Sequence, residues 1–304
     1  MTERVQSGAK TWRDARADVA RRLAEARIAS PEVEARWLTE QASGYAGVEW
    51  LDVQDIELHD RARTNLATMC DRRIAGEPLQ YVLGEWSFRG VDLMVDDRVL
   101  IPRPETEVVV EVAVAEAERL GQRRGRRSLV PHETHGIVAD LGTGSGAIAI
   151  AIEAELPDAE VWATDISEDA LAVARANLAG AGATRVRLAS GWWFDALPTE
   201  LWGRIDLVVS NPPYVADSEF ADLPDEVARY EPHRALVSGP RGTEALEHLV
   251  TNAPRWLSAR GVLVCEIAPH QADPVAALAR AGYPSVDVYP DLTGRARVLV
   301  ARVG

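Results

Sequence analysis

The stretch that decides the fold is Ile137–Ile152, with the sequence IVADLGTGSGAIAIAI. It is typical of an apolar strand, a glycine-rich turn and the start of a helix. Glycines let the backbone approach a ligand closely and adopt left-handed conformations, and a helix N-terminus presents N–H groups that lack intrahelical partners. The loop therefore predicts a ligand with a negative or hydrogen-bond-accepting group. The loop alone fits both NAD and S-adenosylmethionine, because Gly142, Gly144 and Ala147 also satisfy the looser dinucleotide pattern.

An acidic residue follows the second apolar strand. Residues 159–164 form that predicted strand, and Asp165 stands at its end, where a carboxylate can bind the two ribose hydroxyls of an adenosine. Both cofactor classes need this group. Two observations favour S-adenosylmethionine. Asp140 lies two residues before the first glycine of a G-x-G-x-G spacing, and a hydride-transfer enzyme would need a carbonyl-polarising His or Tyr-Lys pair downstream, whereas Lys10 is the only lysine.

Further apolar runs alternate with helical patterns along the rest of the chain. We expect five more strands, at residues 185–189, 205–210, 261–266, 286–289 and 296–302, the last two forming an antiparallel pair. The pattern predicts an α/β fold with a doubly wound, seven-stranded, Rossmann-like sheet. Ligands of such sheets bind at the carboxyl ends of the strands. The glycine loop, Asp165 and the turn after residue 210 would therefore share one edge.

That turn is Asn211-Pro212-Pro213-Tyr214. Proline restricts the backbone of the residue before it, and Pro212 has no N–H but keeps its carbonyl acceptor. We expect Asn211 Oδ1 and the Pro212 carbonyl to form two acceptors on a rigid turn, which fits a planar NH2 group. Tyr214 would offer an aromatic face to a flat amide or nucleobase. A plain tight turn is the alternative interpretation of the tetrapeptide alone.

Two tryptophans follow the third predicted strand, in the sequence Gly191-Trp192-Trp193-Phe194. In a methyltransferase, the residues after this strand lie against the adenine ring of the cofactor. We assign Trp193 to this stacking from its place before Phe194. Packing into the core explains either tryptophan equally well.

The first hundred residues have a different organisation. Residues 1–77 are predicted to form a small helical domain, since apolar residues recur there at helical spacing. Residues 78–104 alternate apolar and polar positions from Tyr81 to Val95, which predicts a β-hairpin linker. The catalytic domain would then occupy residues 105–304. Glu105 opens its first helix, either as a partner of the helix dipole or as part of a substrate channel.

Composition restricts the classes of function. The formal net charge is −14, which disfavours a broad grip on nucleic acid, because that grip depends on neutralising phosphates with Lys and Arg. Cys70 and Cys265 lie far apart and indicate reduced thiols in the cytoplasm, with no disulfide framework or zinc site. We expect no signal peptide, because Arg, Asp and Glu interrupt the first thirty residues, and no apolar run reaches membrane-spanning length.

Two local patterns lie before the glycine loop. Residues 121–128 form an arginine-rich insertion, which is either a solvated loop or an RNA-contacting patch. His132 and His135 have H-x-x-H spacing, but without Cys or paired acids nearby they do not predict a metal site.

Together these motifs resemble the HemK-type release-factor glutamine methyltransferases. The resemblance covers nearly the whole chain: the helical N-terminus, Glu77–Tyr81, Gly84, Phe88, Ile101–Glu107, Gly142–Gly146 and Asn211–Tyr214. It implies N5-methylation of the glutamine in the Gly-Gly-Gln motif of peptide chain release factors. The implied S-adenosylmethionine site consists of Gly142, Thr143, Gly144, Ser145, Gly146, Asp165, Trp193 and Asn211. The implied glutamine site consists of Asn211, Pro212, Pro213 and Tyr214, with Asn211, Pro212 and Tyr214 as the catalytic residues. We add Glu105 to the expected substrate site from its place in the charged segment before the catalytic domain.

Three alternatives stay open at this point. A methyltransferase for the exocyclic amine of adenine could use the same turn on a flipped base, although the acidic charge argues against it. A glutamine methyltransferase for a ribosomal protein would use identical chemistry with a different docking domain. A non-catalytic binding module could keep the fold without the reaction. We expect a cytoplasmic monomer with release factors as its partners and no stable binding to DNA or membranes.

Overall fold

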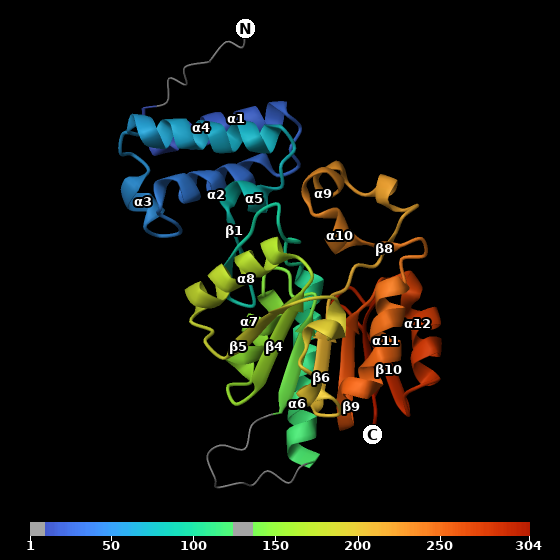
Figure 1. Cartoon of the computed structure of the whole chain (residues 1–304). Coiled ribbons are helices and arrows are strands. Elements are labelled where there is room, and N and C mark those ends of the chain that lie inside the picture. Colours follow the sequence, from blue (N-terminus) through green and yellow to red (C-terminus); the bar gives the residue numbers. More distant parts are fainter. Residues whose placement is uncertain (1–9, 124–135) are drawn as a thin grey trace. The chain divides into compact units, whose positions relative to one another are not determined.

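The structure is a computed structural model that describes residues 10–123 and 136–304. The chain divides into two compact units (Figure 1). The helical unit consists of Met1–Gly84 and Asp225–Tyr230, and the sheet unit consists of Glu85–Pro224 and Glu231–Gly304. Of the two local patterns before the glycine loop, residues 124–128 of the arginine-rich stretch and both histidines lie outside the described residues.

The helical unit is built from helices that pack around one apolar core. They are α1 (Trp12–Glu25), α2 (Pro31–Ser43), α3 (Trp50–Val53), α4 (Asp60–Ile74), α5 (Leu79–Leu83) and α9 (Asp225–Tyr230). Helix α1 begins with a capping box, in which the Thr11 hydroxyl accepts from the Asp14 N–H at 3.2 Å and the Asp14 carboxylate accepts from the Thr11 N–H at 3.2 Å. Helix α2 begins at Pro31 and ends at Gly44, whose φ of 76° is left-handed.

Helix α9 joins the helical unit from far along the sequence. The Arg73 guanidinium donates to Glu34 at 2.7 Å and to Glu226 of α9 at 3.2 Å. The Tyr230 hydroxyl donates to the Ala75 carbonyl at 3.1 Å. A segment that lies between two parts of the sheet unit in sequence is therefore fixed by the N-terminal helices.

The hairpin is shorter than the apolar alternation predicts. Its strands are β1 (Glu85–Phe88) and β2 (Val91–Met94), paired antiparallel, whereas Leu79–Leu83 forms α5. The helix ends at Gly84, which has a φ of 81° and donates its N–H to the Gln80 carbonyl at 2.9 Å. A left-handed glycine ends the helix here, and the strand begins only after it.

The sheet unit contains the predicted seven-stranded sheet. Its strands are β3 (Ile137–Leu141), β4 (Glu160–Asp165), β5 (Val186–Ser190), β6 (Ile205–Ser210), β9 (Leu257–Glu266), β10 (Ser285–Pro290) and β11 (Ala296–Arg302). Their order is β10-β11-β9-β6-β3-β4-β5. Strand β11 is antiparallel to both of its neighbours, and the pairs from β9 to β5 are parallel. The doubly wound α/β prediction is confirmed.

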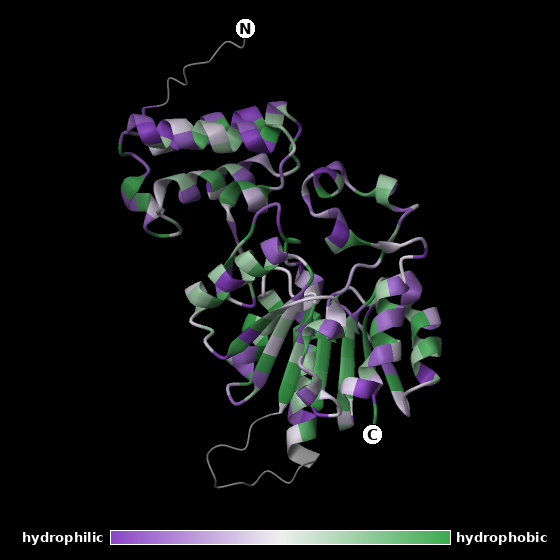
Figure 2. Cartoon of the chain, viewed as in Figure 1, coloured by the Kyte–Doolittle hydropathy of each residue, from purple (hydrophilic) through white to green (hydrophobic). Residues whose placement is uncertain are grey.

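Helices cover both faces of this sheet (Figure 1). Helices α6 (Pro104–Arg123), α7 (Ala147–Glu155) and α8 (Glu168–Ala181) contribute to one apolar cluster, while α11 (Glu244–Trp256) and α12 (Ala272–Arg280) contribute to another. All six residues of β6 are buried, as expected for a parallel strand covered on both faces. Figure 2 accordingly shows the central strands as largely hydrophobic.

Short elements complete the sheet unit. Strands β7 (Val215–Ala216) and β8 (Val237–Gly239) pair in parallel, and α10 (His233–Leu236) precedes β8. Short 3-10 helices lie at Trp193–Ala196, Thr199–Leu201, Phe220–Asp222 and Pro269–Gln271. Across residues 10–123 and 136–304, no helix has the length and apolar character needed to span a membrane.

Candidate active site

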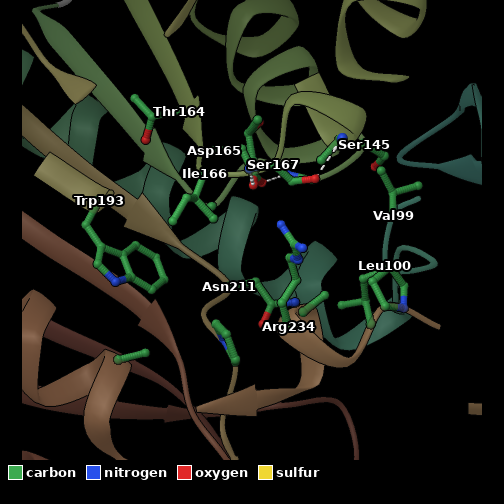
Figure 3. A pocket seen from close by; sticks show the side chains of 18 of the residues that line it. Val99, Leu100, Ser145, Thr164, Asp165, Ile166, Ser167, Trp193, Asn211 and Arg234 are labelled. Atoms are coloured by element: carbon green, nitrogen blue, oxygen red, sulfur yellow. Dashed lines mark hydrogen bonds between the residues drawn. The ribbon is translucent and has the colours of Figure 1, made fainter. Parts of the chain in front are cut away.

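A cavity of about 710 Å³ lies in the sheet unit at the carboxyl ends of its central strands (Figure 3). It brings together most of the site residues predicted from the sequence. Those that line it are Gly142, Thr143, Gly144, Ser145, Asp165, Trp193, Asn211 and Pro213. Gly146, Pro212, Tyr214 and Glu105 are not among its lining residues.

The glycine loop owes its shape to backbone conformations that favour glycine. Gly142 has a φ of 74°, and its N–H and that of Thr143 both donate to the Thr164 carbonyl at 2.8 Å. A Cβ on Gly142 would lie 3.2 Å from the Trp193 ring, so the glycine makes room for the indole. A Cβ on Gly146 would lie 3.4 Å from the Ala174 Cβ, at the contact between the loop and α8. Glycine is therefore needed both for the turn and for close packing.

Asp165 presents a carboxylate fixed by two backbone groups. Its Oδ2 accepts from the Gly144 N–H and its Oδ1 from the Ser167 N–H, each at 2.9 Å. Burial raises the pKa of Asp165, and these two N–H groups partly offset that rise. Each carboxylate oxygen keeps further acceptor capacity. Figure 3 shows Arg234 extending across the cavity toward Asp165. No sequence pattern marks this arginine, since arginine is abundant throughout the chain.

Both tryptophans line the cavity, in different settings. Trp193 is half-buried, whereas Trp192 is 52% exposed. Their rings meet edge to face, with centroids 5.9 Å apart and an angle of 72° between planes. Trp193 has a φ of 45°, a left-handed conformation that costs a non-glycine residue about 1–2 kcal/mol. Local strain of this kind concentrates at functional sites, and the assignment of Trp193 to adenine stays a prediction.

The Asn211 side chain is held by a chain of hydrogen bonds. Its Nδ2 donates to Thr106 Oγ1 at 3.0 Å, and the Thr106 hydroxyl donates to Glu266 Oε2 at 2.7 Å. The preceding Ser210 hydroxyl donates to the Leu141 carbonyl at 2.6 Å, tying the end of β6 to β3. Asn211 therefore lies on the cavity wall with its amide nitrogen directed at α6.

The other end of the turn is fixed by buried groups as well. The Tyr214 carbonyl accepts from Gln271 Nε2 at 2.9 Å. The Tyr214 hydroxyl is a hydrogen-bonding neighbour of Glu266, and burial raises the pKa of this phenol above its usual range. The sequence did not single out Thr106, Glu266 or Gln271, because each comes from a distant part of the chain. The only signal was that Thr106 lies within the segment 101–107.

The segment 101–107 is held in place by the buried carboxylate of Glu231. Glu231 is 5% exposed, is ion-paired with Arg103, and accepts from the Ile101 N–H at 3.3 Å. Glu105 is the second residue of α6 and half-buried. It lies close enough to Glu266 for its charge to raise the pKa of that group.

Several buried polar atoms around the cavity have no hydrogen-bond partner among the described residues. On the lining residues they are Thr164 Oγ1, Trp193 Nε1 and Glu244 Oε2. Asp140 Oδ1 is a fourth such atom, while Asp140 Oδ2 accepts from the Thr143 hydroxyl at 2.6 Å. Burial raises the pKa of Asp140 to about 7. Unpaired buried polar groups are costly. The cavity therefore suits a ligand with donors and acceptors of its own.

Comparison with known proteins shows which family the chain belongs to. Residues 127–228 match the family model Methyltransferase small domain, and residues 14–84 match PrmC N-terminal domain. The chain is 39% identical to the release factor glutamine methyltransferase of Neisseria gonorrhoeae over 278 residues, covering 90% of this chain and 93% of the relative. The protein of the same name from Moorella thermoacetica is 40% identical over 294 residues, covering 96% and 98%. The chain belongs to the release factor glutamine methyltransferase family.

The fold is shared more widely than this family. The hMettl16 catalytic domain, solved in complex with MAT2A 3′UTR hairpin 6, aligns with a TM-score of 0.52 and 16% identity, over 81% of this chain and 82% of that one. At this identity the likeness concerns the sheet and its helices alone. As a member of the release factor glutamine methyltransferase family, the chain is an enzyme that transfers methyl groups, and the alternative of a non-catalytic binding module is excluded.

Within residues 10–123 and 136–304, no group of three or more His, Cys, Asp or Glu side chains could hold a metal ion. Cys70 and Cys265 are both free and buried.

Proposed function

We propose that the cavity binds S-adenosylmethionine and that the protein methylates N5 of the glutamine in the Gly-Gly-Gln motif of peptide chain release factors. The observation that carries this proposal is the Asn211 amide. Its nitrogen is engaged by Thr106 at 3.0 Å, so its oxygen is available on the cavity side for a substrate NH2 group. The family membership supports the choice of glutamine.

The methyl donor would be held by groups that already face the cavity. Asp165 is suited to the ribose hydroxyls, the loop Gly142–Gly146 to the amino-acid portion and Trp193 to the adenine ring. S-adenosylmethionine supplies a methyl group on a positively charged sulfur: the methyl carbon is the electrophile, and the neutral thioether S-adenosylhomocysteine is the leaving group. The unpaired Thr164, Trp193 and Glu244 atoms support a ligand with several polar groups.

The protein would act on the glutamine by orientation. An amide nitrogen is a poor nucleophile because its lone pair is delocalised into the carbonyl. Asn211 Oδ1 and the Pro212 carbonyl would each accept one N–H of the substrate amide, which raises the electron density on nitrogen and favours its pyramidal form. Placed acceptors of this kind stabilise the transition state, and holding the reacting atoms about 3 Å apart supplies much of the rate. The nitrogen loses its proton after methylation, so a strong general base is unnecessary.

We assign docking of the release factor to the N-terminal helical domain, predicted at residues 1–77. The match of residues 14–84 to the PrmC N-terminal domain supports this role. The acidic balance of the chain, −14, disfavours DNA or RNA as the substrate. We expect the protein to act as a monomer in the cytoplasm, where release factors function.

The test offers purified protein with labelled S-adenosylmethionine to a release factor, to ribosomal proteins and to DNA in parallel. The matched control is the same release factor with the glutamine of its Gly-Gly-Gln motif replaced by alanine. We expect label only in the unsubstituted release factor, with mass spectrometry locating the methyl group on that glutamine. Label in ribosomal protein or DNA instead, or in the control release factor, would contradict the proposal.

A further inference from the structure

A buried hydroxyl and a buried carboxylate lie behind the Asn211 amide. Thr106 is 4% exposed and Glu266 is 1% exposed. They reach Asn211 from different elements, since Thr106 belongs to the first turn of α6 and Glu266 is the last residue of β9. Strands β6 and β9 are neighbours, with Ser210 paired to Cys265. Asn211 directly follows Ser210 at the end of β6, and Glu266 directly follows Cys265 as the last residue of β9. The sheet register therefore places the carboxylate beside the turn.

The number of hydrogens available to Thr106 determines which atom of the Asn211 amide it meets. A threonine hydroxyl has one hydrogen to donate and two lone pairs. Thr106 gives its hydrogen to Glu266 Oε2 at 2.7 Å, and an ionised carboxylate can only accept. Toward Asn211, Thr106 therefore offers only a lone pair, and the Asn211 group that meets it at 3.0 Å must be the NH2. The Asn211 oxygen is thereby turned away from Thr106.

We propose that Thr106 and Glu266 are positioning residues that fix the orientation of the Asn211 amide, so that Oδ1 and not Nδ2 meets the NH2 group of the substrate glutamine. This inference rests on the proposed function and names two further residues that the reaction needs. An inverted Asn211 amide would set one NH2 group against another. The substrate would then lose an acceptor and meet a donor that it cannot satisfy.

The surroundings of Glu266 favour its role as an acceptor. Besides the Thr106 hydroxyl, the Tyr214 hydroxyl is a hydrogen-bonding neighbour of the carboxylate. The Arg297 guanidinium from β11 lies 4.0 Å from Glu266 Oε1, and Glu105 of α6 faces it with a like charge. Burial raises the pKa of Glu266 to about 7, against the effects of Thr106 and Arg297. The ionised form that orders the hydroxyls is thus present at neutral pH and dominates above it.

The test compares Thr106→Val with Thr106→Ser. Valine keeps the shape but removes the hydroxyl, whereas serine keeps the hydroxyl and serves as the matched control. Because misplacing a catalytic group by about 1 Å can cost on the order of 10²-fold, we expect Thr106→Val to lower kcat by between about tenfold and 10²-fold. We expect the KM for the release factor and the Kd for S-adenosylhomocysteine to stay nearly unchanged, and Thr106→Ser to keep most of the wild-type kcat. A Thr106→Val enzyme with wild-type kcat would overturn the proposal, as would a loss confined to KM or Kd.

A second measurement does not depend on turnover. The side-chain NH2 of Asn211 can be assigned by nitrogen-15 NMR from the signal that disappears in Asn211→Ala. We expect its hydrogens to exchange slowly in the wild-type protein and in Thr106→Ser, and at least tenfold faster in Thr106→Val. Equal exchange in all three would overturn the positioning role. If the wild-type protein methylated no release factor while this exchange pattern held, the proposed substrate would be wrong and the positioning of Asn211 would stand.

Discussion

Gln271 donates its side-chain amide to the Tyr214 carbonyl at 2.9 Å. The same nitrogen donates to the Gly242 carbonyl at 2.9 Å, and Gln271 is 1% exposed. One buried side chain therefore fastens the end of the Asn211–Tyr214 turn to the loop before α11. The turn is held at both ends, by Gln271 here and by Thr106 at Asn211.

Replacing Gln271 with Met should keep most of the side-chain volume and remove the hydrogen bonds to the Tyr214 and Gly242 carbonyls, together with the one that Gln271 Oε1 accepts from the Ala268 N–H at 3.3 Å. Each carbonyl left without a partner costs roughly 1–3 kcal/mol, so we expect a clear drop in the free energy of unfolding, measured by urea denaturation. We also expect a lower kcat, because the turn loses one anchor. An unchanged urea midpoint together with unchanged kcat would show that the turn does not depend on this side chain.

Removing the Asn211 amide tests the chemistry directly. We expect Asn211→Ala to lower kcat by about 10²-fold or more, by comparison with the loss of one oriented polar group in an oxyanion hole. The Kd for S-adenosylhomocysteine should stay nearly the same, since Asp165 and the glycine loop are intact. Near-normal turnover by this variant would contradict the assigned role of Asn211.

The Asp165 carboxylate should account for much of the cofactor affinity. Asp165→Asn keeps the size of the side chain but replaces one acceptor with a donor, which would also face the Gly144 or Ser167 N–H. Hydrogen bonds to charged groups contribute about 1.5–3 kcal/mol, which corresponds to roughly 10–10²-fold in Kd. Calorimetry with S-adenosylhomocysteine measures this change, and circular dichroism checks that the variant is folded. A Kd equal to that of the wild-type protein would exclude Asp165 as a cofactor ligand.

The two tryptophans can be separated by single substitutions. If Trp193 stacks on adenine, Trp193→Ala should raise the Kd for S-adenosylhomocysteine by about tenfold, because stacking a base on an aromatic ring contributes about 1–3 kcal/mol. The exposed Trp192→Ala variant is the matched control and should change the Kd little. The reverse ranking would transfer the stacking role to Trp192.

The ionisation of Glu266 predicts a pH dependence of kcat. Its pKa is raised to about 7, chiefly by burial. Below this pH the carboxyl group is protonated and can donate a hydrogen bond as well as accept one. Protonation allows Glu266 to donate to Thr106, which removes the constraint on the Asn211 amide. We therefore expect kcat to rise with pH through about 7. Glu266→Gln, which cannot ionise, should flatten this limb of the profile.

Asp140 has a pKa near the same value, about 7, and serves as the control. Glu266→Gln leaves Asp140 unchanged, so a pH profile that persists in Glu266→Gln and disappears in Asp140→Asn would assign the titration to Asp140 instead. The comparison keeps the other groups beside Glu266 in place, namely Thr106, Tyr214, Arg297 and Glu105.

The sequence by itself determined the parts of the protein that depend on neighbouring residues. The glycine loop, Asp165 after its strand and the Asn211–Tyr214 turn are local patterns, and the alternation of strands and helices predicted the seven-stranded sheet. Once parallel strands are assumed, their carboxyl ends must meet at one edge. For this reason most of the site residues predicted from the sequence line the cavity, although they form only a minority of its lining.

Only the tertiary structure decided which distant side chains complete the site. Thr106, Glu266 and Gln271 are ordinary residue types whose roles come from the register of β6 with β9 and from the position of α6. The end of α5 at Gly84 likewise depends on a helix packed in the N-terminal core, where alternation alone predicts a strand. Local patterns fix backbone shape and motif, whereas the orientation of the Asn211 amide depends on hydrogen-bond partners that are 105 residues away in sequence at Thr106.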